Sequence, residues 1–191
     1  MKKNVIYIII LISVLTLNYC KKDEPITVLK IGQSYQGGII AYMFQQGDPG
    51  YDANTKHGLI AAPYDQSTAE IWGCLFTEIS GADGIALGTG NQNTTDIING
   101  CSESGAARLC YDLELNGYSD WYLPSKNELN KLYLNRIAIG GFDPELYWTS
   151  TESGPYTAWY QSFTDGTQYE GNQWNVNKNQ YPLYVRAIRS F

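Results

Sequence analysis

The strongest structural pattern in the chain lies in Tyr118-Ser-Asp-Trp-Tyr-Leu-Pro-Ser-Lys-Asn-Glu-Leu-Asn-Lys-Leu-Tyr133. Ser125 and Glu128, three residues apart, match a capping box, in which each side chain accepts a hydrogen bond from the backbone N–H of the other residue. A helix is therefore predicted to begin at Lys126. The pattern indicates local structure and carries no chemistry of its own.

One face of this predicted helix is apolar. The residues that recur at helical spacing, and that should pack on a core, are Leu129, Leu132, Tyr133 and the pair Arg136-Ile137. The face directed at water holds Lys126, Asn130 and Lys131. Just before the helix, Trp121 precedes Pro124. An aromatic residue in this place usually fills the core beneath the turn, and contact with a ligand is the alternative.

The first twenty residues resemble a bacterial lipoprotein signal. Lys2 and Lys3 precede an apolar run over 5–17, which is shorter than the roughly 20 residues that a helix needs to span a membrane. Such signals are cut before a cysteine that receives a lipid, here Cys20, although Tyr19 stands where a small residue is usual. An uncleaved anchor and ordinary secretion are the alternatives. The expected division is a signal peptide over 1–19, a tether over 20–30 and one domain over 31–191.

A short charged segment, Lys21-Lys22-Asp23-Glu24, follows the cysteine. It resembles the lysine-plus-acidic signal that carries lipoproteins of Bacteroidota to the outer face of the outer membrane. A solvated, charged linker is the alternative. We therefore expect a lipid anchor on Cys20 in the outer membrane and a domain that faces the cell exterior.

The charge of the chain disfavours nucleic acid as a ligand. The 191 residues carry 13 Lys and Arg against 19 Asp and Glu, a net charge of −6. Removal of 1–19 leaves 172 residues and a charge of −8, because Lys2 and Lys3 leave and no acidic residue does. Such a domain offers no basic footprint to a polyanion. The 16 Tyr, 5 Trp and 19 Gly of the full chain are typical of exported, loop-rich proteins with β structure, and suit contact with sugars or proteins.

Three cysteines remain if Cys20 carries a lipid. In an oxidising compartment they allow one disulfide and leave one cysteine over. Cys110 belongs to a helical pattern over 106–113 and should be a small buried hydrophobic residue. Cys74 and Cys101 lie in looser sequence near glycines, so we favour a bond between them, although the pairing does not follow from sequence alone.

The rest of the sequence mixes β-forming runs, turns and short helical patterns. Thr94 or Thr95 can cap a helix that ends at Gly100, and a second helical run covers about 103–115. The expected strands are 37–44, 58–62, 147–151, 158–163 and 184–188, the first two joined as a hairpin by a long loop. This order predicts an α+β domain with about two main helices, long ordered loops, and termini that meet in one twisted antiparallel sheet.

Five short motifs follow one another along the chain: Gly37-Gly38-Ile39, Asp120-Trp-Tyr-Leu-Pro-Ser125, Tyr147-Trp-Thr-Ser-Thr-Glu152, Ala158-Trp159 and Val185-Arg-Ala-Ile-Arg-Ser-Phe191. Together they resemble the Lcl C-terminal domain family, from about Ile31 onward. The resemblance implies a fold related to C-type-lectin-like and formylglycine-generating-enzyme-like domains, and surface adhesion to glycosaminoglycan-type ligands. A glycosaminoglycan is a poor expectation for this chain, because binding of sulfated sugars needs a basic face and this domain is acidic.

The segment 171–181 is the best place to look for a ligand. Its Trp174-Asn175 resembles the Trp-Asn-Asp motif with which C-type lectins hold Ca²⁺ and sugar, but Val176 replaces the carboxylate. Ca²⁺ is therefore a secondary expectation, and no other cofactor or metal is expected. Ring stacking and amide hydrogen bonds can hold a sugar without a metal. The candidate ligand-binding residues are Trp159, Tyr160, Trp174, Asn175, Asn177 and Tyr181, with burial of two or more of these rings as the alternative.

Arg186 and Arg189 lie three residues apart in the last β-forming run. They should point to opposite faces, so that one is buried and the other exposed. A buried arginine needs a carboxylate partner, and the candidates are Glu152, Asp120 and Glu128. Capture of a ligand by an arginine is the alternative. Arg186 is thus predicted to belong to the scaffold, together with Trp121, Pro124, Ser125 and Glu128.

Three kinds of function remain open. A non-catalytic, adhesin-like binding module for glycan or protein is favoured. An enzyme acting on envelope or glycan substrates is the first alternative. Glu145 and Glu152 could form a glycosidase pair, but nothing in the sequence fixes their separation. The oxidase chemistry of the fold group needs a C-terminal cysteine pair, and no cysteine follows Cys110. A structural envelope component without a soluble ligand is the second alternative. His57 has no second histidine with which to hold zinc.

Overall fold

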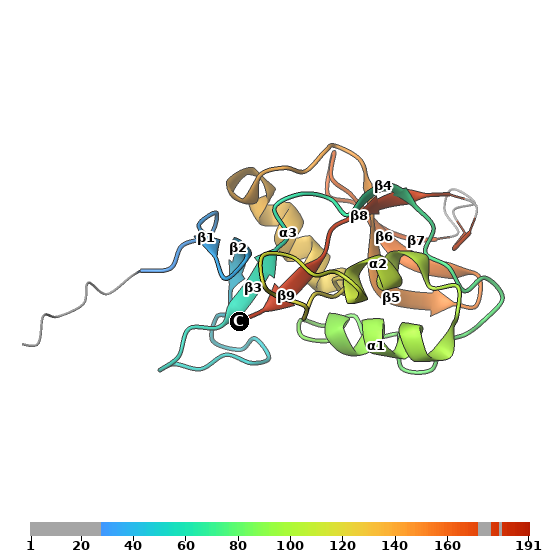
Figure 1. The fold of residues 1–191 in the computed structure, drawn as a ribbon, viewed down its shortest axis with the longest axis horizontal. Coiled ribbons are helices and arrows are strands. Elements are labelled where there is room, and N and C mark those ends of the chain that lie inside the picture. The colour runs from blue at the N-terminus through green and yellow to red at the C-terminus, as the bar shows by residue number, and fades with distance from the viewer. Residues whose placement is uncertain (1–27, 172–176, 180) are drawn as a thin grey trace, which may run out of the picture.

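The computed structural model describes residues 28–171, 177–179 and 181–191. Within them the chain forms three helices and two sheets, which confirms the α+β prediction (Figure 1). The first sheet has the order β1 (Ser34–Tyr35), β2 (Gly38–Met43), β3 (Gly58–Ala61) and β9 (Ile188–Ser190). The second has the order β4 (Ser67–Glu70), β8 (Leu183–Val185), β5 (Leu146–Gly154), β6 (Thr157–Ser162) and β7 (Gln168–Glu170). The helices are α1 (Gly90–Gly100), α2 (Gly105–Tyr111) and α3 (Lys126–Ile139).

Most of the predicted N-terminal organisation, including the signal peptide over 1–19 and Cys20, lies outside the described residues. Among the described helices, none has the length and apolar character that a membrane crossing requires.

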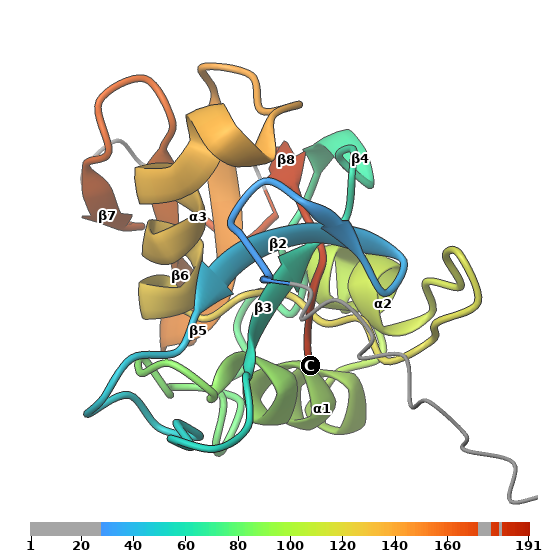
Figure 2. The same cartoon turned by 90° about the vertical axis from the view of Figure 1, so that its left-hand side faces the viewer.

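The strands nearest the two ends of the described chain share the first sheet, as predicted. β2 and β3 form the expected antiparallel hairpin, and β9 pairs antiparallel with β3. Figures 1 and 2 show that the first described residues and the C-terminus consequently lie at the same end of the domain.

The structure has a second sheet beyond the one that the sequence predicts, because the last β-forming run contributes to two sheets. Val185 in β8 pairs with Ser67 in the second sheet, whereas Ile188 in β9 pairs with Ala61 in the first. The chain crosses between the sheets at Arg186-Ala187. In addition, β8 lies parallel to β5.

α3 begins at Lys126, as the capping box predicts. The Ser125 hydroxyl accepts a hydrogen bond from the Glu128 N–H, and Glu128 Oε2 accepts one from the Ser125 N–H at 2.8 Å. Leu129 and Leu132 are fully buried, as predicted. Ile137, however, is 87% exposed, so its predicted place in the core is wrong. At 100° per residue it lies about 140° around the helix from Leu132.

α1 begins at Gly90, four residues before the predicted cap. The Thr94 side chain lies inside the helix, where its Oγ1 donates to the Gly90 carbonyl at 2.8 Å. Glycine suits the first position of the helix because the backbone there packs against the Glu128 carboxylate, where a Cβ would clash. The helix ends at Gly100, as predicted, and α2 is shorter than the predicted run.

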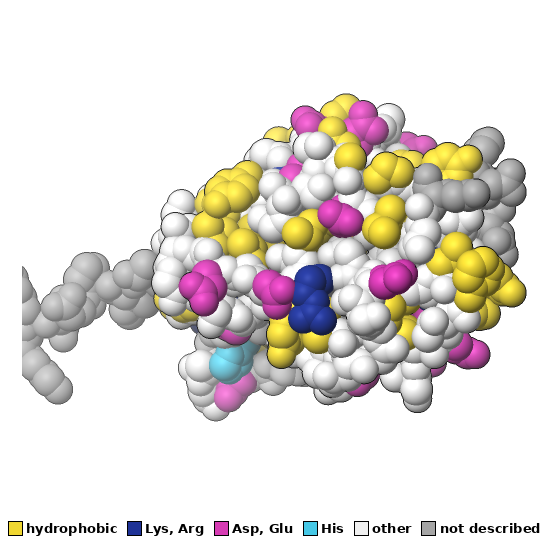
Figure 3. Space-filling model, turned by 45° about the vertical axis from the view of Figure 1, so that its right-hand side comes forward, with side chains coloured by type: hydrophobic (Ala, Val, Ile, Leu, Met, Phe, Trp, Pro, Cys, Tyr) yellow, Lys and Arg dark blue, Asp and Glu magenta, His cyan; other side chains and the backbone are white. Residues whose placement is uncertain are grey.

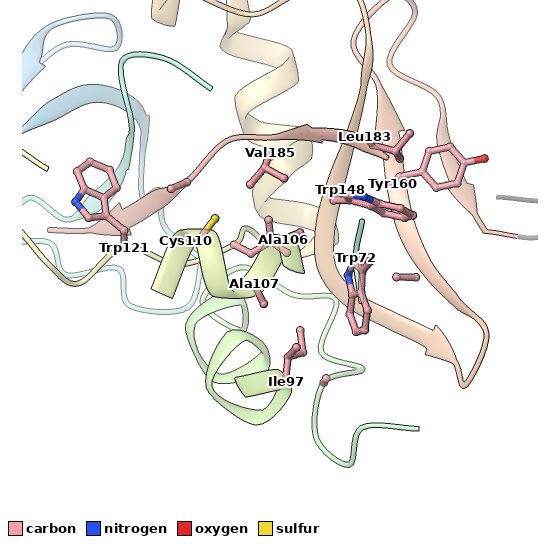
Figure 4. Packing of buried hydrophobic residues seen from close by; sticks show 14 of the residues in the cluster. Trp72, Ile97, Ala106, Ala107, Cys110, Trp121, Trp148, Tyr160, Leu183 and Val185 are labelled. Atoms are coloured by element: carbon pink, nitrogen blue, oxygen red, sulfur yellow. The ribbon is translucent and has the colours of Figure 1, made fainter. Parts of the chain in front are cut away.

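The main core lies between the second sheet, α1 and α2. Trp72 and Trp148 are fully buried there, and their indole N–H groups donate to the carbonyls of Thr149 at 2.8 Å and Glu70 at 2.9 Å. Burying a tryptophan without such a partner would be unfavourable. Figure 4 shows that α2 turns small side chains toward this core, Cys110 among them. Cys110 is free and fully buried, as predicted.

Trp121 fills the core ahead of α3. It is 2% exposed, and its indole N–H donates to the Tyr118 carbonyl at 3.1 Å. Pro124 is also buried, and its carbonyl accepts a hydrogen bond from the Ser150 N–H at 2.8 Å. Both residues therefore belong to the scaffold.

Both C-terminal arginines are buried, which corrects the prediction that one would be exposed. Arg186 pairs with Asp65 at 2.6 Å, a residue absent from the predicted partners, and Arg189 pairs with Asp120 at 2.6 Å. The period-2 rule does not apply, because the chain changes sheets at Arg186. The other two predicted carboxylates are engaged elsewhere: Glu128 caps α3, and Glu152 pairs with Lys178.

Candidate functional site

Three segments meet at the end of the domain opposite β1. They are the loop 73–83, the turn between β5 and β6, and the chain around Lys178. The Phe76 N–H donates to the Pro155 carbonyl at 2.9 Å, and the Lys178 N–H donates to the Tyr156 carbonyl at 3.1 Å. Figure 1 shows the β5–β6 turn and the neighbouring loop at the far end from the first described residues. These backbone hydrogen bonds bring segments that are distant in sequence together, so that they form one surface.

Lys178 is the buried centre of this arrangement. Its carbonyl accepts hydrogen bonds from the N–H groups of Trp72 and Gly73 at 2.8 and 3.1 Å. Its fully buried ammonium binds the Glu152 carboxylate and donates to the Thr77 carbonyl at 3.0 Å. The ammonium also lies 4.5 Å from the centre of the Trp72 ring. Every polar group of Lys178 is therefore engaged in the scaffold.

The electrostatics of Lys178 follow from burial. Desolvation lowers the pKa of the ammonium, and the negative charges of Glu152 and Glu78 oppose that shift. The Glu152 carboxylate holds the ammonium through Oε1, while its Oε2 accepts a hydrogen bond from the Ile79 N–H at 2.8 Å. The ion pair therefore fastens both the Lys178 segment and the loop to β5.

Phe76 is the most unusual residue at this end. Its side chain is 72% exposed, and its backbone has a φ of +71°, a left-handed conformation that bulky residues rarely adopt. Its ring packs edge-on against Tyr156, itself 55% exposed, with 5.6 Å between centroids. An exposed apolar ring on a strained backbone does not favour folding, so it marks a candidate contact surface.

A pocket of about 450 Å³ lies next along the same loop. Its lining residues are Glu78, Ile79, Ser80, Gly81, Asp83 and Glu152. Glu78 and Asp83 are exposed, and neither takes part in the ion pairs formed within the described residues. We call this the acidic pocket, and Phe76 with Tyr156 the aromatic pair.

A disulfide joins the base of this loop to the end of α1. It links Cys74 and Cys101, as favoured from the sequence, with 5.8 Å between their Cα atoms. Cys74 also has a left-handed backbone, with a φ of +61°. The bond therefore fixes the backbone two residues before Phe76.

Replacing Cys74 and Cys101 together by serine should lower the free energy of unfolding by about 3 kcal/mol, because the bond closes a loop with a sequence separation of 27 residues. Urea denaturation measures this loss. Dithiothreitol should destabilise the wild type by a similar amount and leave the double variant unchanged. If dithiothreitol leaves the free energy of unfolding of the wild type unchanged, the expectation is wrong.

The predicted ligand-binding residues do not form one exposed platform. Tyr160 is fully buried, so its predicted contact with a ligand is wrong. Trp159 is half-buried, and the Lys126 ammonium lies 3.3 Å from the centre of its ring, so a cation already occupies that face. Asn177 is half-buried, and Tyr181 is 44% exposed. Trp174 and Asn175 lie outside the described residues.

The residues that shape this end are not apparent from the sequence. Lys178 is distinguished in the sequence only as the sole charged residue in the run 171–185. A lysine in a polar segment is usually exposed to solvent, so its burial could not be inferred from the sequence. Phe76 carried no signal, because its backbone conformation depends on the contact with Pro155 in a distant turn.

The acidic side chains do not build an obvious metal centre. Among the residues that the structure describes, no group of three or more His, Cys, Asp or Glu side chains is arranged to hold a metal ion. The Ca²⁺ expectation rested on Trp174-Asn175 and therefore stays a prediction.

Comparison with known proteins supports the resemblance seen in the motifs. No curated protein matches the chain. A family model does match residues 61–189, a range that runs from the end of β3 into β9 and includes the aromatic pair and the acidic pocket. The matched range covers more than half of the chain, and on this evidence the chain belongs to the Lcl C-terminal domain family.

Proposed function

We propose that the chain is a non-catalytic, lipid-anchored surface module that binds a glycan or a protein through the end that carries Phe76 and Tyr156. The observation that carries this proposal is the exposed Phe76 ring on a left-handed backbone. Folding alone would favour asparagine or glycine at such a position, since both tolerate this conformation. A phenylalanine there is explained by a contact outside the domain.

The rigidity of the surroundings supports binding by a preformed surface. The disulfide holds one side of the Phe76 loop, and the buried pair of Lys178 and Glu152 holds the other. A ligand that meets a fixed surface loses less affinity to ordering than one that meets a mobile loop. Aromatic residues are also the side chains that most often dominate binding energies.

The position of the aromatic pair supports the proposed anchoring. It lies at the end of the domain far from the first described residues (Figure 1). If the chain is held to a membrane through Cys20, this end points away from the attachment. The aromatic pair would then be free to meet a ligand outside the cell.

The surface charge argues against a sulfated polysaccharide as the ligand. Figure 3 shows a face with several separate acidic side chains, scattered hydrophobic patches and a single cluster of basic side chains. A polyanion needs a continuous basic surface. A neutral glycan or a protein fits the aromatic pair better.

The test compares Phe76→Asn with the wild type on glycan and extracellular-protein arrays. Asparagine suits the left-handed backbone, so we expect the free energy of unfolding to change by less than about 0.5 kcal/mol. Binding should fall about 10- to 30-fold, because an anchoring ring is lost.

Ile137→Asn is the matched control, since this side chain is 87% exposed on α3 and belongs to neither the aromatic pair nor the acidic pocket. It should bind like the wild type. If no array ligand distinguishes Phe76→Asn from Ile137→Asn, the proposal is wrong.

A further inference from the structure

The acidic pocket beside the aromatic pair carries more negative charge than the single cation Lys178 compensates. Of its three carboxylates, Glu152 is neutralised by Lys178. Glu78 and Asp83 remain exposed, and no Lys or Arg forms an ion pair with either one within the described part of the chain. The pocket thus offers two exposed carboxylates to a ligand.

Among the described residues, the ion pairs place no cation other than Lys178 at this pocket. In the run 171–185, Lys178 is the only charged residue, and its ammonium is already bound by Glu152 and Thr77. The chain as a whole has a net charge of −6. A cationic group of a ligand would therefore meet no competing lysine or arginine ion pair at Glu78 or Asp83 within the described residues.

The aromatic pair and the acidic pocket belong to one continuous stretch of loop. Phe76 stands two residues before Glu78, and the backbone between them is fixed where the Thr77 carbonyl accepts a hydrogen bond from Lys178. Tyr156 contacts the Phe76 ring from the neighbouring turn. A single bound segment could therefore touch apolar rings and carboxylates together.

We propose that this surface binds a protein segment in which an arginine or lysine stands beside an apolar side chain. The cationic group enters the acidic pocket near Glu78 and Asp83, while the apolar side chain packs on Phe76 and Tyr156. This proposal rests on the proposed function and specifies its ligand. The complementary charges give selectivity and faster association, and the rings give most of the affinity.

The test uses the full chain and three fluorescein-labelled peptides, read by fluorescence anisotropy. The first alternates leucine and arginine, the second alternates leucine and glutamate, and the third alternates serine and arginine. We expect the leucine–arginine peptide to bind about tenfold more tightly than the serine–arginine peptide, and the leucine–glutamate peptide not to bind. Raising the salt from 50 to 500 mM should weaken the first complex, since exposed charges are screened.

Three charge variants locate the cation. Glu78→Gln and Asp83→Asn should each weaken binding of the leucine–arginine peptide about two- to fivefold, as expected for one exposed charge pair. Glu145→Gln is the control, because Glu145 precedes β5 and the β5 strand of 9 residues, roughly 30 Å long, separates it from the turn with Tyr156. It should bind like the wild type, and Phe76→Asn should lose about tenfold.

The outcomes separate this inference from the proposed function. Equal binding of the arginine and glutamate peptides, or equal losses in Glu145→Gln and Glu78→Gln, would overturn the inference. An array ligand that needs Phe76 but is a neutral or sulfated glycan would overturn it while leaving the binding function intact. If no array ligand and no peptide depends on Phe76, both fail.

Discussion

Arg186→Met should lower the free energy of unfolding by about 3–5 kcal/mol, the range measured when one partner of a buried ion pair is removed. Methionine keeps most of the side-chain volume, so the loss reports the guanidinium rather than a cavity. Urea denaturation, followed by tryptophan fluorescence, measures the change.

The expected size follows from what Arg186 holds together. Its Nε binds Asp65 at 2.6 Å, its Nη1 donates to the Ala62 carbonyl at 3.0 Å, and its Nη2 donates to the Gly141 carbonyl. The guanidinium also lies 4.1 Å from the centre of the Phe142 ring. Without it, the Asp65 carboxylate and two carbonyls lose their partner at the point where the chain crosses between sheets.

The control for Arg186 is Arg108→Met. Arg108 also pairs with an aspartate, Asp112, but at 3.6 Å and with side chains that are 41% and 60% exposed. Solvent screens such a pair, so we expect a loss of at most about 1 kcal/mol. Equal losses at the two positions would show that burial of the Arg186 ion pair does not explain its contribution to stability.

Lys178→Met should destabilise the domain by a similar amount, about 3–5 kcal/mol, because it leaves the Glu152 carboxylate buried without a cation. The same variant should weaken any binding that depends on Phe76, since the Thr77 carbonyl in that loop loses its donor. Urea denaturation and the peptide titration measure the two effects.

A second substitution tests the cause. Adding Glu152→Gln to Lys178→Met should restore about half or more of the lost stability, because a neutral amide is far easier to bury than a charge. Glutamine keeps a carbonyl oxygen for the Ile79 N–H, which Glu152 binds in the wild type. If the double variant is less stable than Lys178→Met alone, the buried charge is not the source of the loss.

Local patterns in the sequence were sufficient to predict those elements whose structure is determined by a few neighbouring residues. The cap of α3 needs only Ser125 and Glu128, and the β2–β3 hairpin follows from two β-forming runs. The starting point of α1 could not be found in this way, because the glycine at its first position packs against the Glu128 carboxylate, which is distant in sequence. Intrinsic propensity disfavours glycine in a helix, and the tertiary contact overrides it.

The division into two sheets depends on contacts that no local pattern contains. Arg186 and Asp65 are 121 residues apart, and their pair lies where the chain leaves one sheet for the other. The alternation rule that predicted one buried and one exposed arginine assumes an unbroken strand.

The candidate site was predictable only in its general region. The sequence directed attention to the segment 171–181, and the structure brings Lys178 of that segment against the Phe76 loop. The aromatic rings chosen there were judged by residue type, which cannot separate the buried Tyr160 from the exposed Tyr156. Whether a particular aromatic residue is exposed depends on the packed fold, whereas its residue type gives only the average burial for that type.

The pairing of β9 with β3 has a consequence for synthesis. Leu59 pairs with Ser190. The ribosome adds the partner strand of β3 about 130 residues after β3 itself, a delay on the order of 10 s at ordinary elongation rates. Throughout that time the hydrogen-bonding edge of β3 that faces β9 is open, and open edges invite pairing with other chains. Until β9 is available to pair, β3 can therefore form incorrect pairs with strands of other chains.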